Sequence, residues 1–446
     1  MAITVGLACI LTSIATLLAQ PPAGPVLWTF TNDWPYVLPP ALGKDGTVYV
    51  GTYNDLSAVT NNGSEAGRKW SIELYGLTGA TVGADGTIYV GNGSTNFLAV
   101  NPDGSVRWAY TFNAASSPPA IAFDNTVYTV AAGNLNALTP TGSIKWSFPI
   151  FAGTAVPVIG GDGTIYVRND QQPATLYAIS PAGTLKWSTS FGWGSSYPGD
   201  APALAADGTI YVNGGNLYAV SPDGSPRALT ATQFGFSPVL ANDGNIHISS
   251  YIGDALYSLN SNGETNWQVK FPYRCVWIAC LPSITPAADN AGNVYFGGDN
   301  SIYSISRDGQ QEWVVKSPAS GGGFPVDMTS PALAPNGTIY GTVSNILYAI
   351  AGTIPSSDSP WPMLGQNARR TGKVERPSLL HANHAPDGNF QFEVYGQLGQ
   401  TQAVQVSTDL LAWSPLTNVL ATNVPVGFVD LSATNFPTRF YRTVQQ

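Results

Sequence analysis

Few residues of this sequence have the types and spacing that catalytic chemistry requires. The 446 residues include 3 His and 3 Cys, and charged residues make up only 10% of the chain. His381 and His384 lie near the C-terminus, and His247 stands where related segments of the chain have a tyrosine. A Ser–His–Asp site needs a histidine beside a nucleophile and a carboxylate, and no such grouping can be identified. We therefore expect no catalytic residue and no metal ligand.

The cysteines divide between the N-terminus and one later segment. Cys9 lies in an apolar run, whereas Cys275 and Cys280 form an even pair in the sequence CVWIAC. An oxidising compartment favours a disulfide between these two, with free or buried thiols as the alternative. Metal binding is disfavoured because no histidine lies nearby. We expect a disulfide between Cys275 and Cys280.

Residues 1–19 have the composition of a secretory signal peptide. An almost unbroken apolar run ends in the sequence LLA at residues 17–19, although the usual positive N-terminal region is missing. We expect cleavage near Gln20, with retention as a membrane anchor as the alternative, and we expect no transmembrane span after cleavage. The sequence thus predicts a secreted, extracellular or periplasmic protein, with attachment to the cell surface as an option.

The composition points to a repetitive β-protein. The chain has 48 Gly, 34 Pro and 11% aromatic residues, which is typical of many short strands joined by tight turns. Its length exceeds one ordinary compact core, but repetition of small sheets extends a core. The net charge of -9 and the lack of clustered Lys and Arg exclude a nucleic-acid-binding protein.

The chain contains a sequence repeat, whose strands and turns would determine where any functional residue lies. The repeat is clearest at residues 202–220, PALAADGTIYVNGGNLYAV. Eight copies align on an aromatic position at intervals of roughly 36 to 48 residues, which is the spacing of four-stranded propeller blades. The aligned residues are Tyr49, Tyr89, Tyr128, Tyr166, Tyr211, His247, Tyr295 and Tyr340.

Each copy has a tight turn between its first two strands, such as Asp45-Gly46 or Asp162-Gly163. Asp-Gly tolerates the positive φ angles of a type I′ turn, so these strands are expected to be antiparallel neighbours. A conformational role for the Asp is preferred over calcium binding, because the further ligands of a calcium loop are absent. A second tight turn, such as Asp103-Gly104, leads to a fourth strand.

The fourth strands predict how the array closes. The fifth copy has Arg227 where most copies have a tryptophan, so we expect this blade to be the loosest at its outer edge. The eighth copy ends at Ile350 with no fourth strand, whereas residues 26–30, VLWTF, read as an unpaired fourth strand. Eight inner triplets match eight outer strands only if the N-terminal strand completes the last blade. The predicted fold is an all-β, eight-bladed β-propeller closed by an N-terminal strand.

The repeat D-G-T-[IV]-Y-V, then L-Y-A-[VI], then x-G-x-x-[KR]-W resembles the pyrroloquinoline quinone (PQQ)-like repeat of quinoprotein alcohol dehydrogenase-like propellers, over about residues 26–352. The resemblance implies that the repeated tryptophans pack between neighbouring blades, which is also the usual role of an indole at a repeated strand position. These residues are Trp28, Trp70, Trp108, Trp146, Trp187, Trp267 and Trp313.

The sequence predicts four segments: a signal peptide at 1–19, the propeller at 24–352, a linker and docking segment at 353–376, and a small β-rich C-terminal domain at 377–446. The sequence WPMLGQNARRTG at 361–372 resembles a docking segment that flanks many secreted propellers of the family. The C-terminal residues resemble a small module of diverse secreted bacterial proteins, through STDL at 407–410 and Trp413. No role for this module follows from its sequence.

A candidate binding face follows from the turn pattern. Both series of tight turns share one face of the propeller, so the variable connections form the opposite face, which we call the variable face. Its longest connections are residues 188–201, 268–285 and 314–330, and packing of these loops on themselves is the alternative to ligand binding. The candidate contact residues are Trp193, Tyr197, Asp200, Tyr273, Arg274, Trp277, Phe324 and Asp327.

The preferred function is a noncatalytic, monomeric scaffold that binds a protein or a surface glycan, similar to the outer-membrane assembly propellers of the family. An enzyme is the alternative. The resemblance implies that a quinone-dependent alcohol dehydrogenase would hold PQQ and calcium with acidic and amide side chains near the axis. No glutamate of the propeller is placed for such a site, so no cofactor is predicted. A glycan-binding or glycan-hydrolysing protein is a third possibility.

Overall fold

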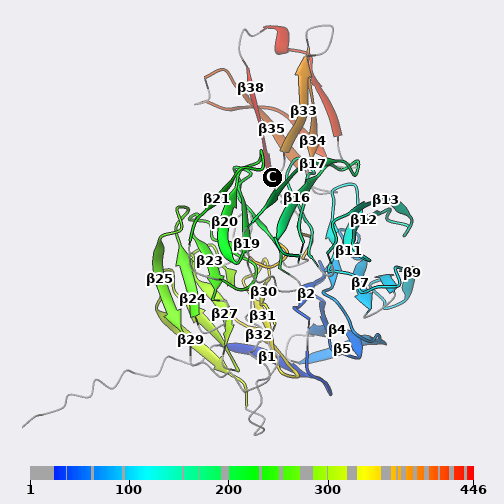
Figure 1. The fold of residues 1–446 in the computed structure, drawn as a ribbon, viewed down its shortest axis with the longest axis vertical. Helices are drawn as coiled ribbons and strands as arrows, with labels where there is room; N and C mark the ends of the chain where they lie inside the picture. The colour runs from blue at the N-terminus through cyan, green and yellow to red at the C-terminus, as the bar shows by residue number, and fades with distance from the viewer. Residues whose placement is uncertain are drawn as a thin grey trace, which may run out of the picture.

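The chain folds into β-sheets that surround a common axis, followed by two smaller sheets near the C-terminus (Figure 1). The computed structural model describes residues 25–36, 38–61, 65–92, 96–152, 155–169, 171–191, 200–230, 234–250, 255–271, 285–298, 300–318, 329–352, 363–367, 370–372, 378–384, 389–395, 401–409, 412–420, 426–435 and 439–445. Within these residues, eight antiparallel sheets have four strands each, and they are numbered here as blades 1 to 8 in chain order.

Every blade has the same strand order from the axis outwards. The innermost strands are β2 (Ala41–Leu42), β6 (Thr81–Val82), β10 (Ala120–Ile121), β14 (Val158–Ile159), β18 (Ala203–Leu204), β22 (Val239–Leu240), β26 (Ala287–Ala288) and β30 (Ala332–Leu333). The second strands are β3 (Val48–Gly51), β7 (Ile88–Asn92), β11 (Val127–Ala131), β15 (Ile165–Arg168), β19 (Ile210–Gly214), β23 (Ile246–Ser249), β27 (Val294–Gly298) and β31 (Ile339–Val343).

The outer half of each blade consists of a third and a fourth strand. The third strands are β4 (Asp55–Asn61), β8 (Asn96–Val100), β12 (Asn134–Leu138), β16 (Thr175–Ile179), β20 (Asn216–Val220), β24 (Ala255–Leu259), β28 (Ser301–Ile305) and β32 (Ile346–Ile350). The outermost strands are β5 (Ala66–Glu73), β9 (Val106–Thr111), β13 (Ile144–Pro149), β17 (Leu185–Ser190), β21 (Pro226–Ala228), β25 (Thr265–Lys270), β29 (Gln311–Lys316) and β1 (Val26–Thr31).

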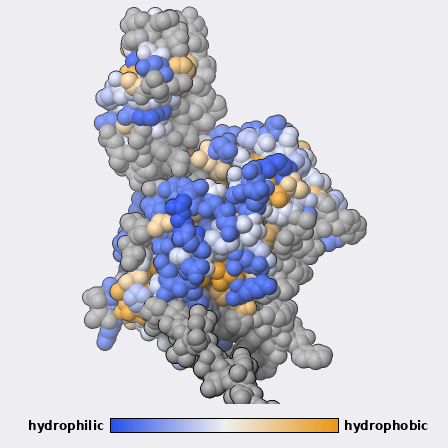
Figure 2. Space-filling view, turned by 90° about the vertical axis from the view of Figure 1, so that its left-hand side faces the viewer, coloured by the Kyte–Doolittle hydropathy of each residue, from blue (hydrophilic) through white to orange (hydrophobic). Residues whose placement is uncertain are grey.

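Burial follows distance from the axis. Both residues of every innermost strand are buried, whereas outermost strands such as β9 and β17 alternate half-buried and exposed positions. Inner strands lie between two neighbouring sheets and are therefore apolar on both faces, while outer strands meet water along one edge. Accordingly, the side of the propeller shown in Figure 2 is mainly hydrophilic, with hydrophobic residues in separate patches.

The N-terminal strand closes the ring, as the repeat count predicts. Strand β1 pairs antiparallel with β32, with Phe30 opposite Leu347 and Val26 opposite Ile350. The ring of Trp28 lies 5.8 Å from that of Tyr340 on β31, which is the same contact that tryptophan and tyrosine make within other blades. The last blade therefore takes one strand from the start of the chain and three from the end of the repeat.

The tryptophans of the outermost strands contact the next blade. The indole Nε1 of Trp70 donates a hydrogen bond of 2.8 Å to the Pro102 carbonyl oxygen in the second tight turn of blade 2. Gly104 of that turn has φ +91°, and a Cβ atom there would lie 2.8 Å from Trp70, so the indole needs a glycine beneath it. Equivalent hydrogen bonds run from Trp108 to Pro140, from Trp146 to Pro181, from Trp187 to Pro222 and from Trp267 to Arg307.

Blade 5 makes this contact with a different side chain. Its fourth strand, β21, is the shortest outermost strand among the described residues, and all its residues are exposed. Arg227 pairs with Ala219, as Trp108 pairs with Ala99 in blade 2, and its Nη2 donates to the Ser261 carbonyl oxygen of blade 6 at 3.2 Å. The arginine thus replaces the hydrogen bond of the missing tryptophan, although it does not replace its ring.

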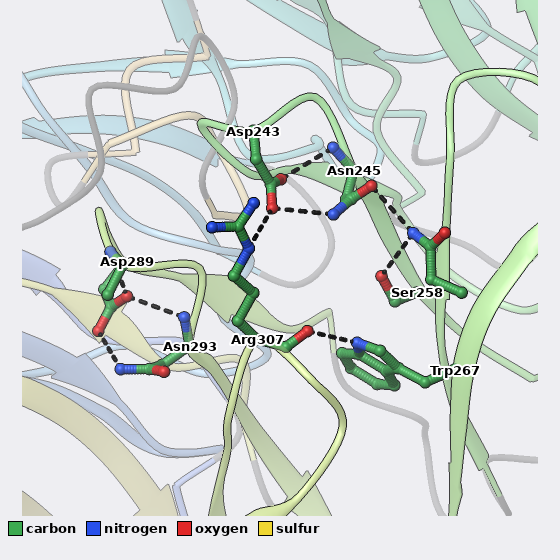
Figure 3. A network of polar contacts seen from close by, with 9 residues as sticks. Asp243, Asn245, Ser258, Trp267, Asp289, Asn293 and Arg307 are labelled. Atoms are coloured by element: carbon green, nitrogen blue, oxygen red, sulfur yellow. Dashed lines mark hydrogen bonds and ion pairs between the residues drawn. The ribbon is translucent and has the colours of Figure 1, made fainter.

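Blades 6 and 7 are joined by a polar network on the tight-turn face (Figure 3). The guanidinium of Arg307 in blade 7 forms an ion pair of 3.3 Å with Asp243 in blade 6, and the Arg307 carbonyl oxygen accepts the hydrogen bond from Trp267. Asp243 also accepts a hydrogen bond from the Asn245 side chain at 2.9 Å. A single residue therefore fixes the second turn of blade 7 against both the first turn and the outermost strand of blade 6.

The first and second strands are antiparallel neighbours, as predicted, but the turns between them are not of type I′, and that part of the prediction is wrong. A type I′ turn needs positive φ at both central residues, but of Asp45 and Gly46 only Gly46 has a positive φ, of +81°. The Gly46 amide donates to the Gly43 carbonyl oxygen, while Asp45 accepts hydrogen bonds from the amide and hydroxyl of Thr47 at 3.1 and 2.8 Å. The loop is a wider turn closed by a left-handed glycine, in which the carboxylate takes over backbone hydrogen bonding.

The C-terminal residues form two three-stranded sheets. One has the order β33 (Ser378–His384), β34 (Phe390–Tyr395), β37 (Val426–Asp430), and the other β36 (Ser414–Leu420), β35 (Thr401–Ser407), β38 (Phe440–Gln445), with the 3-10 helix η1 (Ala433–Asn435) between β37 and β38. Phe392, Val394, Val404 and Val419 form the small core. Across all described residues, no helix has the length and apolar character needed to cross a membrane.

The closing strand gives a first testable prediction. Trp28 is 8% exposed and Leu27 is 55% exposed on the same strand. Trp28→Ala should lower the free energy of unfolding by about 3 kcal/mol, because it removes a packed ring from blade 8, while Leu27→Ala should change it by less than about 0.5 kcal/mol. Urea unfolding measures both values. Deletion of residues 20–31 should destabilise the protein further, and equal stability of all variants would contradict closure by this strand.

His247 predicts a sensitivity to acid. The imidazole is buried and stacks on Trp267 with ring centroids 5.6 Å apart. Burial lowers the His247 pKa to about 4, against an opposing effect of the Asp243 charge. Below the ordinary histidine pKa near 6.5 the unfolded chain takes up a proton that the folded chain does not, so stability falls as the pH falls towards 4.

The expected loss from this histidine between pH 7 and pH 5 is about 2 kcal/mol. His247→Tyr restores the residue of the other seven copies and removes the titrating group, so the variant should lose correspondingly less stability over this range. Urea unfolding of both proteins at the two pH values gives the comparison. Parallel losses in the two proteins would show that His247 does not carry the effect.

Candidate functional site

The strand order separates two unlike faces. Because neighbouring strands of each blade are antiparallel, the first tight turns and, in the blades that have one, the second tight turns lie at one end of the sheet. The connections from second to third strands, and those from one blade to the next, lie at the other end. This arrangement places the variable face where the sequence predicts it.

On the tight-turn face, the aspartates of four first turns are paired with cations. In blades 1 to 4 an aspartate of the first turn accepts from the following threonine and from a Lys or Arg of the outermost strand. The ion pairs are Asp45–Lys69 at 3.0 Å, Asp85–Arg107 at 3.0 Å, Asp124–Lys145 at 3.5 Å and Asp162–Lys186 at 3.1 Å. The described part of the chain contains no cluster of three or more His, Cys, Asp or Glu that could hold a metal ion. These turns therefore have a conformational role.

Of the predicted contact residues, the structure describes only Asp200, and this residue is buried. It is 5% exposed, and its carboxylate lies 3.2 Å from the Arg168 guanidinium and 3.4 Å from the Asn213 amide nitrogen. Arg168 belongs to blade 4 and Asn213 to blade 5, so Asp200 ties two blades together from within. A buried ion pair of this kind specifies local geometry.

The other predicted residues fall outside the described ranges. They are Trp193, Tyr197, Tyr273, Arg274, Trp277, Phe324 and Asp327, together with Cys275 and Cys280. Their contribution to a binding face and the disulfide remain predictions. The signal peptide at residues 1–19 also remains a prediction.

The inner ends of the blades are bridged by a segment from beyond the repeat. Residues 363–367 and 370–372, which belong to the predicted linker and docking segment, contact several blades. Met363 and Leu364 pack on the apolar cores of the later blades. The Thr371 carbonyl oxygen accepts from the Ile121 amide of blade 3, and that of Gly372 accepts from the Ile159 amide of blade 4, at 2.9 and 2.7 Å. We call residues 363–367 and 370–372 the axial segment.

Arg370 makes the most extensive contacts of the axial segment. Its Nε donates to the Pro40 carbonyl oxygen of blade 1 at 2.7 Å, and Nη2 donates to the Ser330 carbonyl oxygen of blade 8 at 3.0 Å. Its Nη1 donates to Leu364 within the segment at 2.9 Å. Burial lowers the Arg370 pKa to about 9, and backbone carbonyl oxygens compensate for the lost hydration. Arg370 therefore connects the first and last blades of the ring.

These contacts test whether the axis could hold PQQ and calcium, as it would in the alternative function of a quinone-dependent enzyme. A calcium ion requires several oxygen ligands, with carboxylates among them. Here the carbonyl oxygens at the inner ends of blades 1 and 8 already accept hydrogen bonds from the Arg370 guanidinium. A buried cation in this position opposes a second cation. The described residues at the axis thus do not fit such a centre.

Besides Phe151, three exposed aromatic residues on the variable face were missed by the sequence prediction. Trp34, Tyr53 and Tyr75 are 56%, 59% and 66% exposed. All three lie on short connections around blade 1, whereas the prediction selected the longest loops. The available signal was their position, because each is an aromatic residue outside the repeat pattern and in a connection on the variable face.

The contacts of Arg370 predict how strongly this residue stabilises the fold. Arg370→Ala removes the donor to carbonyl oxygens of two blades and should lower the free energy of unfolding by about 3 kcal/mol or more. Arg370→Lys keeps a positive charge but lacks the fork of donors, so an intermediate loss is expected. Arg107→Ala, at an exposed ion pair, is the matched control and should cost less than about 1 kcal/mol.

Hydrogen exchange locates the effect of Arg370. The amides of Ile121 and Ile159 donate to the axial segment and should lose protection in Arg370→Ala, while amides in the outermost strands should keep theirs. Wild-type stability and unchanged protection of both amides would show that the axial segment does not hold the blades.

Comparison with known proteins agrees with the geometry. A family model described as outer membrane protein assembly factor BamB matches residues 15–149, which is less than half of the chain. BamB from Moraxella catarrhalis is 15% identical, with a TM-score of 0.55 over 72% of this chain and 97% of that chain. The C-terminal WD40 domain of Sif2 is 10% identical, with a TM-score of 0.55 over 74% and 96%.

A third similar structure is an enzyme. Quinohemoprotein alcohol dehydrogenase from Comamonas testosteroni is 11% identical, with a TM-score of 0.52 over 75% of this chain and 77% of that chain. No curated protein sequence matches the chain. Similarities at these identities concern the fold. Taken with the repeat and with the eight sheets of the described residues, they show that the chain contains a PQQ-like β-propeller.

Proposed function

We propose that the protein is a secreted, noncatalytic scaffold that binds a partner protein through the variable face of its propeller. The observation that carries the proposal is the axial segment. Arg370 occupies the carbonyl oxygens at the inner ends of blades 1 and 8, and Thr371 and Gly372 bind the amides of blades 3 and 4. The axis is thus used to hold the blades, which leaves the loops as the surface for recognition.

The contrast between the two faces supports the same function. The tight-turn face repeats one arrangement in blades 1 to 4, where the first-turn aspartate is bound to its own turn and to a cation of the outermost strand. The variable face has connections of unequal length and carries exposed aromatic side chains such as Tyr53 and Tyr75. Exposed aromatic residues surrounded by polar ones are typical of protein interfaces.

The similarity to BamB favours a protein partner over other ligands. The matching family model and one of the similar structures are both named for this outer membrane assembly factor. A role in holding proteins together, outside the cytoplasm, agrees with the predicted signal peptide at residues 1–19. The chain in its monomeric form would provide one variable face for one partner.

The function can be tested by crosslinking from defined positions. A photoreactive amino acid placed at exposed Phe151 on the variable face should crosslink a partner in the native secretion compartment, and one placed at Lys44 on the tight-turn face should not. Mass spectrometry identifies the partner, which is then purified for binding measurements. Crosslinks from Lys44 alone would refute the assignment of the face.

Variants of the predicted loops complete the test. Replacement of Trp193, Tyr273 and Trp277 by Ala should weaken binding of the purified partner, with a loss of about 2 kcal/mol or more for a true hot spot. Circular dichroism should show an intact fold. Quinone-dependent alcohol oxidation by the wild-type protein, after addition of PQQ and calcium, would overturn the noncatalytic function.

A further inference from the structure

The exposed aromatic residues around blade 1 form one surface feature. Trp34, Tyr53 and Tyr75 come from three connections, yet their segments lie side by side. Tyr36, two residues after Trp34, bridges to Thr52, the residue before Tyr53. The Gly76 amide, next to Tyr75, donates to the Tyr53 carbonyl oxygen at 3.0 Å. We call Trp34, Tyr53 and Tyr75 the aromatic strip.

Backbone pairing holds the supporting segments in place. Asp55 at the start of β4 lies opposite Glu73 at the end of β5, and the Leu74 amide donates to the Asn54 carbonyl oxygen at 3.0 Å. The Asn32 amide and the Tyr36 amide donate to carbonyl oxygens of Asn345 and Ser344 in blade 8. Neighbouring paired segments are about 5 Å apart, so the aromatic strip spans about 10 Å. This is enough to contact more than one side chain of an extended peptide.

Carboxylates flank the aromatic strip. Asp33 adjoins Trp34, Glu73 lies two residues before Tyr75, and both are exposed. Neither forms an ion pair within the part of the chain that the structure describes. The nearby cation, Arg68, donates to the Asn32 side chain at 2.5 Å and lies over the Phe30 ring at 5.6 Å. The two carboxylates are thus available to an incoming group.

The chemistry of this surface selects one kind of partner. The face of an aromatic ring attracts a cation, and a guanidinium or ammonium gains further from nearby carboxylates. The net charge of -9 also favours a basic ligand over an acidic one. We propose that the aromatic strip, with Asp33 and Glu73, binds a Lys- or Arg-containing extended segment of the partner protein. This inference rests on the proposed function and names the chemistry of its partner.

The test uses full-length protein and a defined probe. A fluorescein-labelled peptide of alternating Arg and Gly is titrated and followed by fluorescence polarisation, with a second peptide in which Gln replaces Arg. The Arg peptide should bind, more weakly as salt is added, because exposed charges are screened. The Gln peptide should not bind. Equal binding of the two peptides would overturn the inference.

Variants assign the binding to the aromatic strip. Combined replacement of Trp34, Tyr53 and Tyr75 by Ala should weaken binding of the Arg peptide by about tenfold or more, since each exposed cation–π contact contributes about 0.5–1 kcal/mol. Leu185→Ala is the control, because Leu185 is an apolar residue, 47% exposed, on the outermost strand β17 of blade 4 and away from the variable face. It should leave the affinity unchanged. Unchanged affinity in the triple variant would overturn the inference.

A charge variant separates a basic peptide from a neutral glycan. Asp33→Asn combined with Glu73→Gln should weaken binding of the Arg peptide several-fold and reduce its salt dependence, while the rings remain in place. A soluble neutral glucan oligosaccharide is titrated in parallel. Binding of the oligosaccharide that needs the rings but not the carboxylates, with no binding of the Arg peptide, would assign the aromatic strip to a glycan and overturn the inference.

The outcome is independent of the test of the proposed function. If the purified partner stays bound to the triple variant of the aromatic strip but is lost when Trp193, Tyr273 and Trp277 are replaced, the scaffold function stands and this inference fails. If no partner is crosslinked from the variable face, the function itself fails. Loss of the partner in the aromatic-strip variant, together with binding of the Arg peptide, supports both.

Discussion

The Arg370 guanidinium holds the first and last blades of the ring together at its centre. The two ends of the repeat meet inside blade 8, where β32 ends the repeat and β1 begins it. Arg370 donates to Pro40 of blade 1 and to Ser330 of blade 8. Further out, β1 closes the ring, because it pairs with β32 and leads directly into blade 1. The ring is therefore fastened twice, by backbone pairing at its rim and by a buried cation at its centre.

An arginine suits the axis because backbone carbonyl oxygens there need hydrogen-bond donors. The strands nearest the axis are two residues long, so the residues beside them leave carbonyl oxygens without a strand partner. An apolar side chain there would bury these oxygens unsatisfied, at a cost that exceeds the gain from packing. A guanidinium carries donors in several directions and remains charged even with the pKa lowered to about 9. The axial segment thus satisfies inner polar groups that no repeat can satisfy alone.

The sequence was sufficient to predict the features that recur in every blade. It was not sufficient to predict contacts that a single residue makes. Eight aligned aromatics and an unmatched N-terminal strand were enough to derive the blades and their closure, because both follow from counting strands. The first turns were predicted wrongly, since Asp-Gly fits several turn types and Asp45 binds Thr47 instead of adopting a positive φ. The sequence at 361–372 resembles a docking segment, but the Arg370 contacts join residues as far as 330 positions apart, and nothing in that segment identifies the carbonyl oxygens that Arg370 binds. Trp34, Tyr53 and Tyr75 were overlooked because loop length was taken as the guide to binding.

The same architecture explains why recognition falls to the loops. Many of the described tight turns contact a neighbour: five second-turn glycines lie under a tryptophan, as Gly104 does under Trp70, and five first-turn aspartates form an ion pair, as Asp243 does with Arg307. A substitution in these turns disturbs a contact between blades, so this face has little freedom to acquire a ligand. Connections on the variable face are limited only by where their strands end. Asp33 and Glu73 can stay unpaired there because water solvates them, and a partner that brings its own cations gains their attraction without breaking a contact within the ring.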